Sequence, residues 1–150
     1  MDHTVVVTNP ASGRGRGARM LPAVRTAFGA VGITDIRTTT RAGDEAITGP
    51  EADMADLANV ERAVAGAHTV LHLAADPSPR ADFYASLLDR NIKATYNVVH
   101  ASVAAGVKRV VFASSVNAIL GYPAAHQARA TDVPFPGNVY GASKAWGEAV

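Results

Sequence analysis

The segment Arg109-Val110-Val111-Phe112-Ala113-Ser114-Ser115 is a short apolar run that ends in two serines. It has the length of a β-strand and is apolar on successive residues. The runs Thr4–Thr8 and Thr69–Ala74 share this pattern. Continuous apolar runs of this length are typical of strands that are buried on both faces, as in a parallel sheet covered by helices.

Helical patterns separate these strands. A helix is expected to begin after Asp56, which can cap it, and to stop at Gly66. A longer helix is expected over Phe83–Ala105, where apolar residues recur at helical spacing. The first crossover helix is placed at Met20–Val31, although Pro22 lies inside it and disfavours a helix interior.

Two weaker strands complete the pattern, one at Thr34–Thr39 and one in Ala46–Asp53, which contains a Gly-Pro pair. Alternating strands and helices predict right-handed βαβ units. We therefore expect a single α/β domain over residues 1–150, with a doubly wound parallel sheet in the strand order 3-2-1-4-5. The stretch from Leu120 to Val139 is expected to form a long loop, and loops of this length are often functional.

The composition narrows the classes of function. The chain has 150 residues, 14 Lys+Arg, 13 Asp+Glu and no cysteine. A net charge of +1 gives no field for nucleic acid, and the apolar runs fall short of the roughly 20 residues of a membrane span. Cysteine chemistry is excluded, and the histidines lack the spacing of metal ligands. We expect a cytoplasmic protein without a bound metal, nucleic-acid partner or membrane anchor.

A glycine-rich segment, Thr8–Gly17, directly follows the first strand. Such a strand-to-helix turn lets backbone N–H groups approach a pyrophosphate. Its glycines are not spaced as in the strict dinucleotide fingerprint, so a flexible loop remains an alternative, and RNA binding through Arg14–Arg19 is a minor one. At the end of the second strand, where a carboxylate would hold the ribose of NAD, stand hydroxyl residues followed by Arg41. Arg41 would suit the 2′-phosphate of NADP, although it can also be a solvated loop residue.

The last third of the chain carries three side chains suited to carbonyl–alcohol redox chemistry. Ser115 follows a strand end, and Tyr140 and Lys144 are four residues apart, hence on one face of a helix. A tyrosine can exchange a proton with a substrate oxygen, a lysine ammonium stabilises its phenolate, and a serine orients the substrate oxygen. The order of these residues predicts a catalytic site at the carboxyl end of the sheet.

Five motifs, taken in order, make the chain resemble the extended short-chain dehydrogenase/reductase family, of the NAD(P)-dependent epimerase/dehydratase type. They are Asp53–Leu57, Val70–Ala75, Asn91–Val98, Gly106–Ser115 and Tyr140–Lys144. The segment Ala75–Arg80 and Asn117 resemble the uronate-dehydrogenase-like branch. The resemblance implies a Rossmann-like fold, NAD or NADP as cofactor, and a sugar-like small-molecule substrate, either an alcohol or a hemiacetal.

The resemblance also implies roles for individual residues. Ser115, Tyr140 and Lys144 would be catalytic, with Lys144 also on the nicotinamide ribose, and Asn91 would support the lysine through a water. Of the remaining cofactor contacts, Gly13 and Arg14 would lie against the pyrophosphate. Asp53 and Met54 would flank the adenine. The cofactor cleft would be lined by Leu73, Ala74 and Ala75.

Three features depart from the family pattern. Asn9-Pro10 stands where one glycine is usual, and Arg16 stands at the position of the third glycine. The chain also ends at Val150, where family members continue with a sixth strand and a C-terminal substrate region, so both are expected to be lacking. A catalytically silent chain that binds a dinucleotide weakly, or only a partner, is therefore the alternative to an enzyme. The oligomeric state is left open, with a homodimer as one option.

Overall fold

The computed structural model describes residues 4–8, 12–33, 35–38 and 53–150, and their side chains over 19–33 and 53–150. Asn9, Pro10 and Arg41 lie outside the described residues, as does all of Ala46–Asp53 except Asp53 itself. The predictions that rest on them therefore stay predictions.

Four parallel strands form one sheet: β1 (Thr4–Thr8), β2 (Asp35–Thr38), β3 (Thr69–His72) and β4 (Arg109–Phe112). Their spatial order is β2-β1-β3-β4. The predicted strands at these four places are therefore present, and their pairing is parallel throughout. These strands occupy places 2, 1, 4 and 5 of the predicted five-strand order. The complete order, and the lack of a sixth strand, stay predictions.

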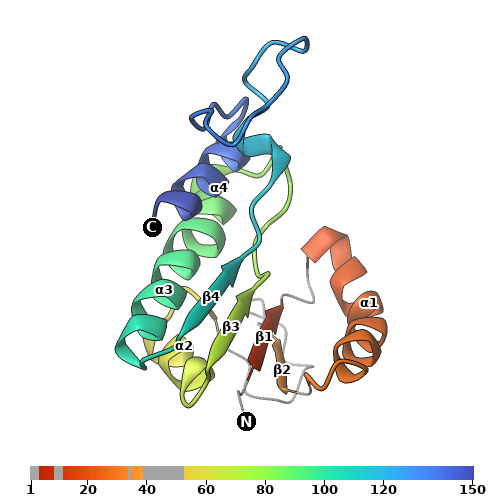
Figure 1. Cartoon of the computed structure of the whole chain (residues 1–150), viewed down its shortest axis with the longest axis vertical. Helices are drawn as coiled ribbons and strands as arrows, with labels where there is room; N and C mark the ends of the chain where they lie inside the picture. The colour runs from red at the N-terminus through yellow and green to blue at the C-terminus, as the bar shows by residue number, and fades with distance from the viewer. Residues whose placement is uncertain (1–3, 9–11, 34, 39–52) are drawn as a thin grey trace.

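Helices lie on both sides of this sheet. Figure 1 shows α1 on one side and α2, α3 and α4 together on the other. In chain order the helices are α1 (Ser12–Gly29), α2 (Leu57–Val64), the π-helix η1 (Phe83–Lys93), α3 (Ala94–Ala104), the 3₁₀ turn η2 (Val116–Ala118) and α4 (Val139–Ala149). The predicted helix over Phe83–Ala105 is thus one continuous helical segment whose first half is of the π type.

The start of α1 corrects the prediction. The helix was expected at Met20–Val31, but it begins at Ser12, so the glycine-rich segment lies mostly within it and Pro22 lies in its interior. Glycine readily adopts helical dihedrals despite its entropic cost, and the prediction gave that segment to a turn. Pro22 lacks an N–H donor, and its own carbonyl accepts a hydrogen bond from the Oγ1 of Thr26 at 3.1 Å.

The start of α2 and the ends of α2 and α3 follow the predicted signals. Asp56 caps α2 by accepting a hydrogen bond from the backbone N–H of Ala58 at 2.9 Å. Gly66 and Gly106 follow α2 and α3 with φ of +70°, where glycine meets no steric penalty. After α3, the N–H of Val107 donates to the carbonyl of Ser102 at 2.9 Å, which closes the helix and directs the chain into β4.

The hydrophobic core lies between the sheet and the helix pair α2 and α3. Each fully buried valine there contributes about 1.5–3 kcal/mol relative to an exposed one. The buried cluster consists of Met54, Val60, Val64, Ala67, Val70, Ala74, Ala94, Val98 and Ala101. This packing fixes β3 and α3 relative to each other, and thereby the carboxyl end of the sheet.

Candidate active site

The candidate site lies beyond the carboxyl ends of β1, β3 and β4. The strands end in register, with Val7 beside His72 and His72 beside Phe112. The chain leaves β1 for β2 on one side and leaves β3 for β4 on the other, so a topological switch point lies between β1 and β3. In open α/β sheets, ligands bind in the crevice at such a point.

Helix α4 contributes two adjacent polar side chains to this edge. Asn138 caps the helix, because its Oδ1 accepts a hydrogen bond from the N–H of Gly141 at 2.7 Å. Tyr140 and Lys144 follow one turn apart and are only 6% and 4% exposed. Side chains four apart on a helix are neighbours, and the Nζ of Lys144 lies 5.9 Å from the centroid of the Tyr140 ring.

The ammonium group of Lys144 is held at the end of β4. Its Nζ donates a hydrogen bond of 2.8 Å to the carbonyl oxygen of Ala113 and lies 4.8 Å from the centroid of the Phe112 ring. Burial lowers the pKa of Lys144 from 10.5 to about 8, because desolvation disfavours the charged form. The lysine therefore still carries a proton at neutral pH.

Ser115 is connected to the start of α4 through two asparagines. Its Oγ accepts hydrogen bonds from the backbone N–H and the Nδ2 of Asn117, both at 3.2 Å. The Oδ1 of Asn117 accepts from the Nδ2 of Asn138 at 2.8 Å, and Asn138 caps α4. The hydroxyl that was predicted from the strand end is thus linked to the helix that carries Tyr140. Because Ser115 accepts both of these bonds, its own proton is free for a further acceptor.

The first turn of α4 packs directly on the backbone of η2. A Cβ at Gly141 would lie 2.1 Å from the carbonyl oxygen of Asn117. Only glycine permits this approach, so Gly141 sets the distance between the Tyr140 turn and the segment that carries Ser115.

Asn91 connects three parts of the site. It is buried in η1, and its Oδ1 accepts from the N–H of Asp76 at 2.8 Å while its Nδ2 donates to the carbonyl of Asp76 at 3.2 Å. The same Nδ2 donates to the Oγ of Ser143 at 3.0 Å, and that hydroxyl donates to the carbonyl of Tyr140 at 2.7 Å. Its predicted support of Lys144 through a water stays a prediction.

The residues predicted to contact the cofactor are divided along the same edge of the sheet. Leu73, Ala74 and Ala75 follow β3 directly, and Leu73 is the most exposed of the three. Gly13 and Arg14 lie in the first turn of α1, which follows β1. These positions flank the switch point from its two strands.

Asp53 and Met54, which are predicted to flank the adenine, lie just before α2. The Oδ1 of Asp53 accepts from the N–H of Ala55 at 3.0 Å, and Asp53 is exposed. The side chain of Met54 is in the core, and its carbonyl accepts from the Nδ2 of Asn97 at 2.9 Å. Any contact of Met54 with an adenine would therefore be made by its backbone.

Four residues of the site were not singled out as such from the sequence: Phe112, Asn138, Gly141 and Ser143. Asn138 had a readable signal, since an asparagine just before a helix is a strong N-cap. The other three act through contacts with distant parts of the chain, which no local pattern indicates.

His72 is a buried polar group beside the site. Its Nε2 lies 3.2 Å from the Oγ1 of Thr95, while its Nδ1 is buried without a partner. Burial, and secondarily the charge of Lys144, lower the pKa of His72 from 6.5 to about 4, so the ring is neutral at pH 7. Among the described residues, no group of three or more His, Asp or Glu is placed to hold a metal ion.

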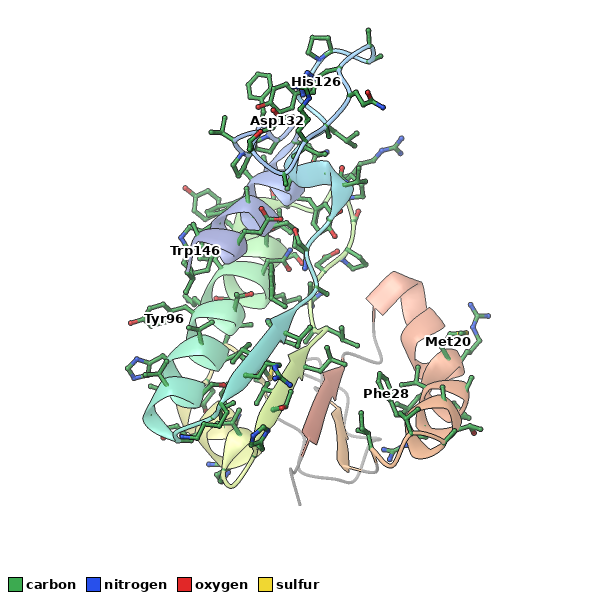
Figure 2. The ribbon with its side chains drawn as sticks, in the orientation of Figure 1. Met20, Phe28, Tyr96, His126, Asp132 and Trp146 are labelled. Atoms are coloured by element: carbon green, nitrogen blue, oxygen red, sulfur yellow. The ribbon has the colours of Figure 1, made fainter. Side chains whose placement is uncertain are left out.

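A polar and aromatic cluster holds the long loop between η2 and α4. Figure 2 shows His126 and Asp132 in this loop, beyond the first turn of α4 and away from the C-terminus, and His126 Nε2 lies 2.7 Å from Asp132 Oδ2. The Tyr122 ring stacks on His126 with centroids 4.3 Å apart, and the Tyr122 hydroxyl donates to the carbonyl of Val133 at 2.9 Å. The loop that the sequence predicted is therefore ordered by its own contacts. No helix in the described part of the chain is long and apolar enough to cross a membrane.

A parallel sheet with a topological switch point, and a buried tyrosine and lysine on one helix at the carboxyl end of β4, are typical of a nucleotide-binding α/β protein. The sequence model of the NAD dependent epimerase/dehydratase family matches residues 17–150. The chain therefore belongs to this family.

Individual relatives agree with this membership. An NAD-dependent glucose-6-phosphate dehydrogenase of Haloferax volcanii is 39% identical over 111 residues, which cover 66% of this chain and 42% of that protein. The structure of a mutated uronate dehydrogenase matches 99% of this chain and 52% of its own, with a TM-score of 0.77 and 29% identity. A tyrosine-to-alanine variant of the Agrobacterium tumefaciens uronate dehydrogenase, solved with NAD, matches 97% of this chain and 54% of its own, with a TM-score of 0.73 and 28% identity. The chain thus spans about half the length of these relatives.

Proposed function

We propose that this protein is an NAD(P)-dependent dehydrogenase of a sugar-like alcohol or hemiacetal. The observation that carries the proposal is the placement of Tyr140 and Lys144, buried side by side on α4 at the carboxyl end of β4. The substrate class follows the glucose-6-phosphate and uronate dehydrogenases to which the chain is similar.

The residues at the switch point fit a dinucleotide. α1 is long enough to offer an N-terminus with free N–H groups to a pyrophosphate, and it follows β1 across residues 9–11. On the other strand, Leu73 is partly exposed and apolar, as a cleft wall for a cofactor ring requires. When bound, the nicotinamide of the cofactor would accept the hydride of the substrate.

Tyr140 would act as the general base. Its phenolate would take the proton of the substrate hydroxyl while the hydride leaves the same carbon, so that the alcohol becomes a carbonyl. The ammonium of Lys144 favours the phenolate, because an adjacent positive charge stabilises a negative one in a buried site. Ser115 would orient the substrate oxygen by donating a hydrogen bond to it from its hydroxyl, whose oxygen already accepts two hydrogen bonds from Asn117.

The test is a calorimetric titration of NAD⁺ and NADP⁺ into the wild-type protein and into Lys144→Ala. If Lys144 binds the nicotinamide ribose, Lys144→Ala weakens the preferred dinucleotide at least about tenfold, as expected for a hydrogen bond to a charged group. Lys108→Ala is the matched control, because Lys108 is exposed at the opposite end of β4. The affinity of this variant for the dinucleotide is expected to equal that of the wild type. No heat with either dinucleotide would reject the proposal.

A chain that binds a dinucleotide without turnover is the second candidate. The observation that favours it is the departure of the segment around Arg16 from the usual glycine pattern. Sugar-dependent reduction of NAD⁺ or NADP⁺, followed at the absorbance of the reduced cofactor with glucuronate and glucose 6-phosphate, separates the two candidates. Binding with no reduction in the presence of either sugar would favour the silent chain.

A further inference from the structure

The side chain of Lys144 rests on an aromatic ring. Its Nζ lies 4.8 Å from the centroid of Phe112, the last residue of β4, and donates to the carbonyl of the next residue, Ala113. An ammonium within about 6 Å of a ring centroid is attracted by the negative face of the ring, and the attraction grows when water is excluded. Lys144 is only 4% exposed, so water is excluded here.

The ring of Phe112 is itself fixed by its neighbours. On the β3 side, the ring of His72 lies 5.8 Å away, centroid to centroid, at an interplanar angle of 33°. On the α4 side, a Cβ at Gly147 would lie 2.5 Å from the Cζ of Phe112 and 2.8 Å from its Cε1. The ring therefore occupies the volume that any side chain at Gly147 would need, one helical turn after Lys144.

We propose that Phe112 is the positioning residue of Lys144, and that Gly147 provides the space in which its ring lies. The ring holds the ammonium between the carboxyl end of β4 and Tyr140 and offsets part of the cost of burying the charge. The contact between the Phe112 ring and the ammonium stands by itself. Its consequence for cofactor binding and catalysis rests on the proposed function.

Few other charges act on this ammonium. From β3 it faces His72, which is neutral at pH 7, and from α4 it faces Tyr140. The acidic residue of α4, Glu148, is exposed, and its Oε1 accepts a hydrogen bond from Ser114. The residues of η1 and η2 that bond to α4 and its cap are uncharged, namely Asn91, which bonds to Ser143, and Asn117, which bonds to Asn138. Among the described residues, no carboxylate lies within ion-pair distance of Lys144. Its compensation is therefore the carbonyl of Ala113 and two rings, of which Phe112 at 4.8 Å is nearer than Tyr140 at 5.9 Å.

The test measures the titration of Lys144 directly. The chain has three lysines, at 93, 108 and 144, so ¹³C-labelled lysine gives three side-chain resonances in an NMR pH titration. In the wild type, the Lys144 midpoint is expected near pH 8. In Phe112→Leu the midpoint is expected to fall by a further 0.5–1 unit (an order-of-magnitude value), because desolvation remains while the attraction is lost. An unchanged or raised midpoint would overturn the proposal.

Two variants separate this effect from a general loss of structure. Phe83→Leu makes the same change at a half-buried phenylalanine that contacts Tyr84 in η1, and it is expected to leave the Lys144 midpoint in place. Gly147→Ala keeps the phenyl group but displaces it, and it is expected to lower the Lys144 midpoint as well. If Phe112→Leu does not fold, Gly147→Ala tests the proposal alone. A Lys144 midpoint equal to that of the wild type in this variant would refute the positioning of Lys144 by the Phe112 ring.

A second readout distinguishes this proposal from the function itself. If the wild type binds a dinucleotide, Phe112→Leu is expected to weaken it several-fold while Phe83→Leu does not. If the wild type binds neither NAD⁺ nor NADP⁺, the proposed function fails, and the NMR midpoints still determine whether the ring positions the ammonium.

Discussion

The side-chain amide of Asn91 donates a hydrogen bond of 3.0 Å to the Oγ of Ser143, which lies 52 residues further along the chain. This bond joins η1 to the turn of α4 that carries Tyr140 and Lys144. Because Asn91 also pairs with both backbone groups of Asp76, the segment after β3 and the helix α4 are held by one buried side chain. The segment after β3 and the first turns of α4, which lie on two sides of the candidate site, are therefore fixed relative to each other.

Ser143→Ala is expected to lower the free energy of unfolding by about 1–2 kcal/mol, because it removes an acceptor of Asn91 and the donor to the Tyr140 carbonyl. Urea unfolding measures this loss. In a double-mutant cycle with Asn91→Ala, we expect a coupling energy of about 0.5–1.5 kcal/mol. Strictly additive effects would mean that the bond between the two residues contributes nothing.

Gly141→Ala is expected to destabilise the protein by about 1–3 kcal/mol, although alanine normally favours a helix. The reason is the carbonyl of Asn117, which lies 2.1 Å from the position of the new Cβ, so α4 must move away from η2. Gly29→Ala is the matched control, since a Cβ at that helical glycine meets no atom within 4 Å. Thermal unfolding of both variants provides the comparison, and equal effects would contradict the close packing of α4 on η2.

The sequence was sufficient for the sheet because the apolar runs Thr4–Thr8 and Arg109–Ala113 have the length and composition of buried strands. It was also sufficient for helix ends where glycine has a positive φ, as at Gly106. It failed at the start of α1, where glycine permits both a turn and a helix, and tertiary context decides between them.

The candidate site was predictable only in part for a related reason. The adjacency of Tyr140 and Lys144 follows from helical spacing alone. The connection of Ser115 to α4 depends on Asn117 and Asn138, which are 21 residues apart and meet only in the folded chain. The contact of Phe112 with Gly147 likewise joins a strand to a helix, and no local pattern encodes it.

Asp132→Asn is expected to loosen the loop between η2 and α4. The backbone N–H of Arg129 and then the ring of His126 hold the pKa of Asp132 below its usual value, which shows that both favour the ionised carboxylate. An amide weakens both contacts, so trypsin should cleave after the exposed Arg129 several times faster. Asp89→Asn, which removes an exposed ion pair with Lys93 in η1, is the control. Equal cleavage of wild type and Asp132→Asn at Arg129 would show that the pair does not order the loop.

His72 is expected to make the protein sensitive to mild acid. Its pKa is about 4 in the folded chain and 6.5 when exposed, so between these values the unfolded chain binds more protons than the folded one. Stability is therefore fully present above pH 6.5 and decreases as the pH falls toward 4, by at most about 3 kcal/mol. His72→Gln removes the titrating ring and keeps a polar group that can reach Thr95, so its unfolding free energy should depend less on pH in this window. Chemical unfolding of both proteins at intervals between pH 4 and 7 measures the difference, which isolates His72 from the carboxylates that titrate in both. Parallel curves would show that the ring accepts its proton as readily in the folded protein as in the unfolded chain.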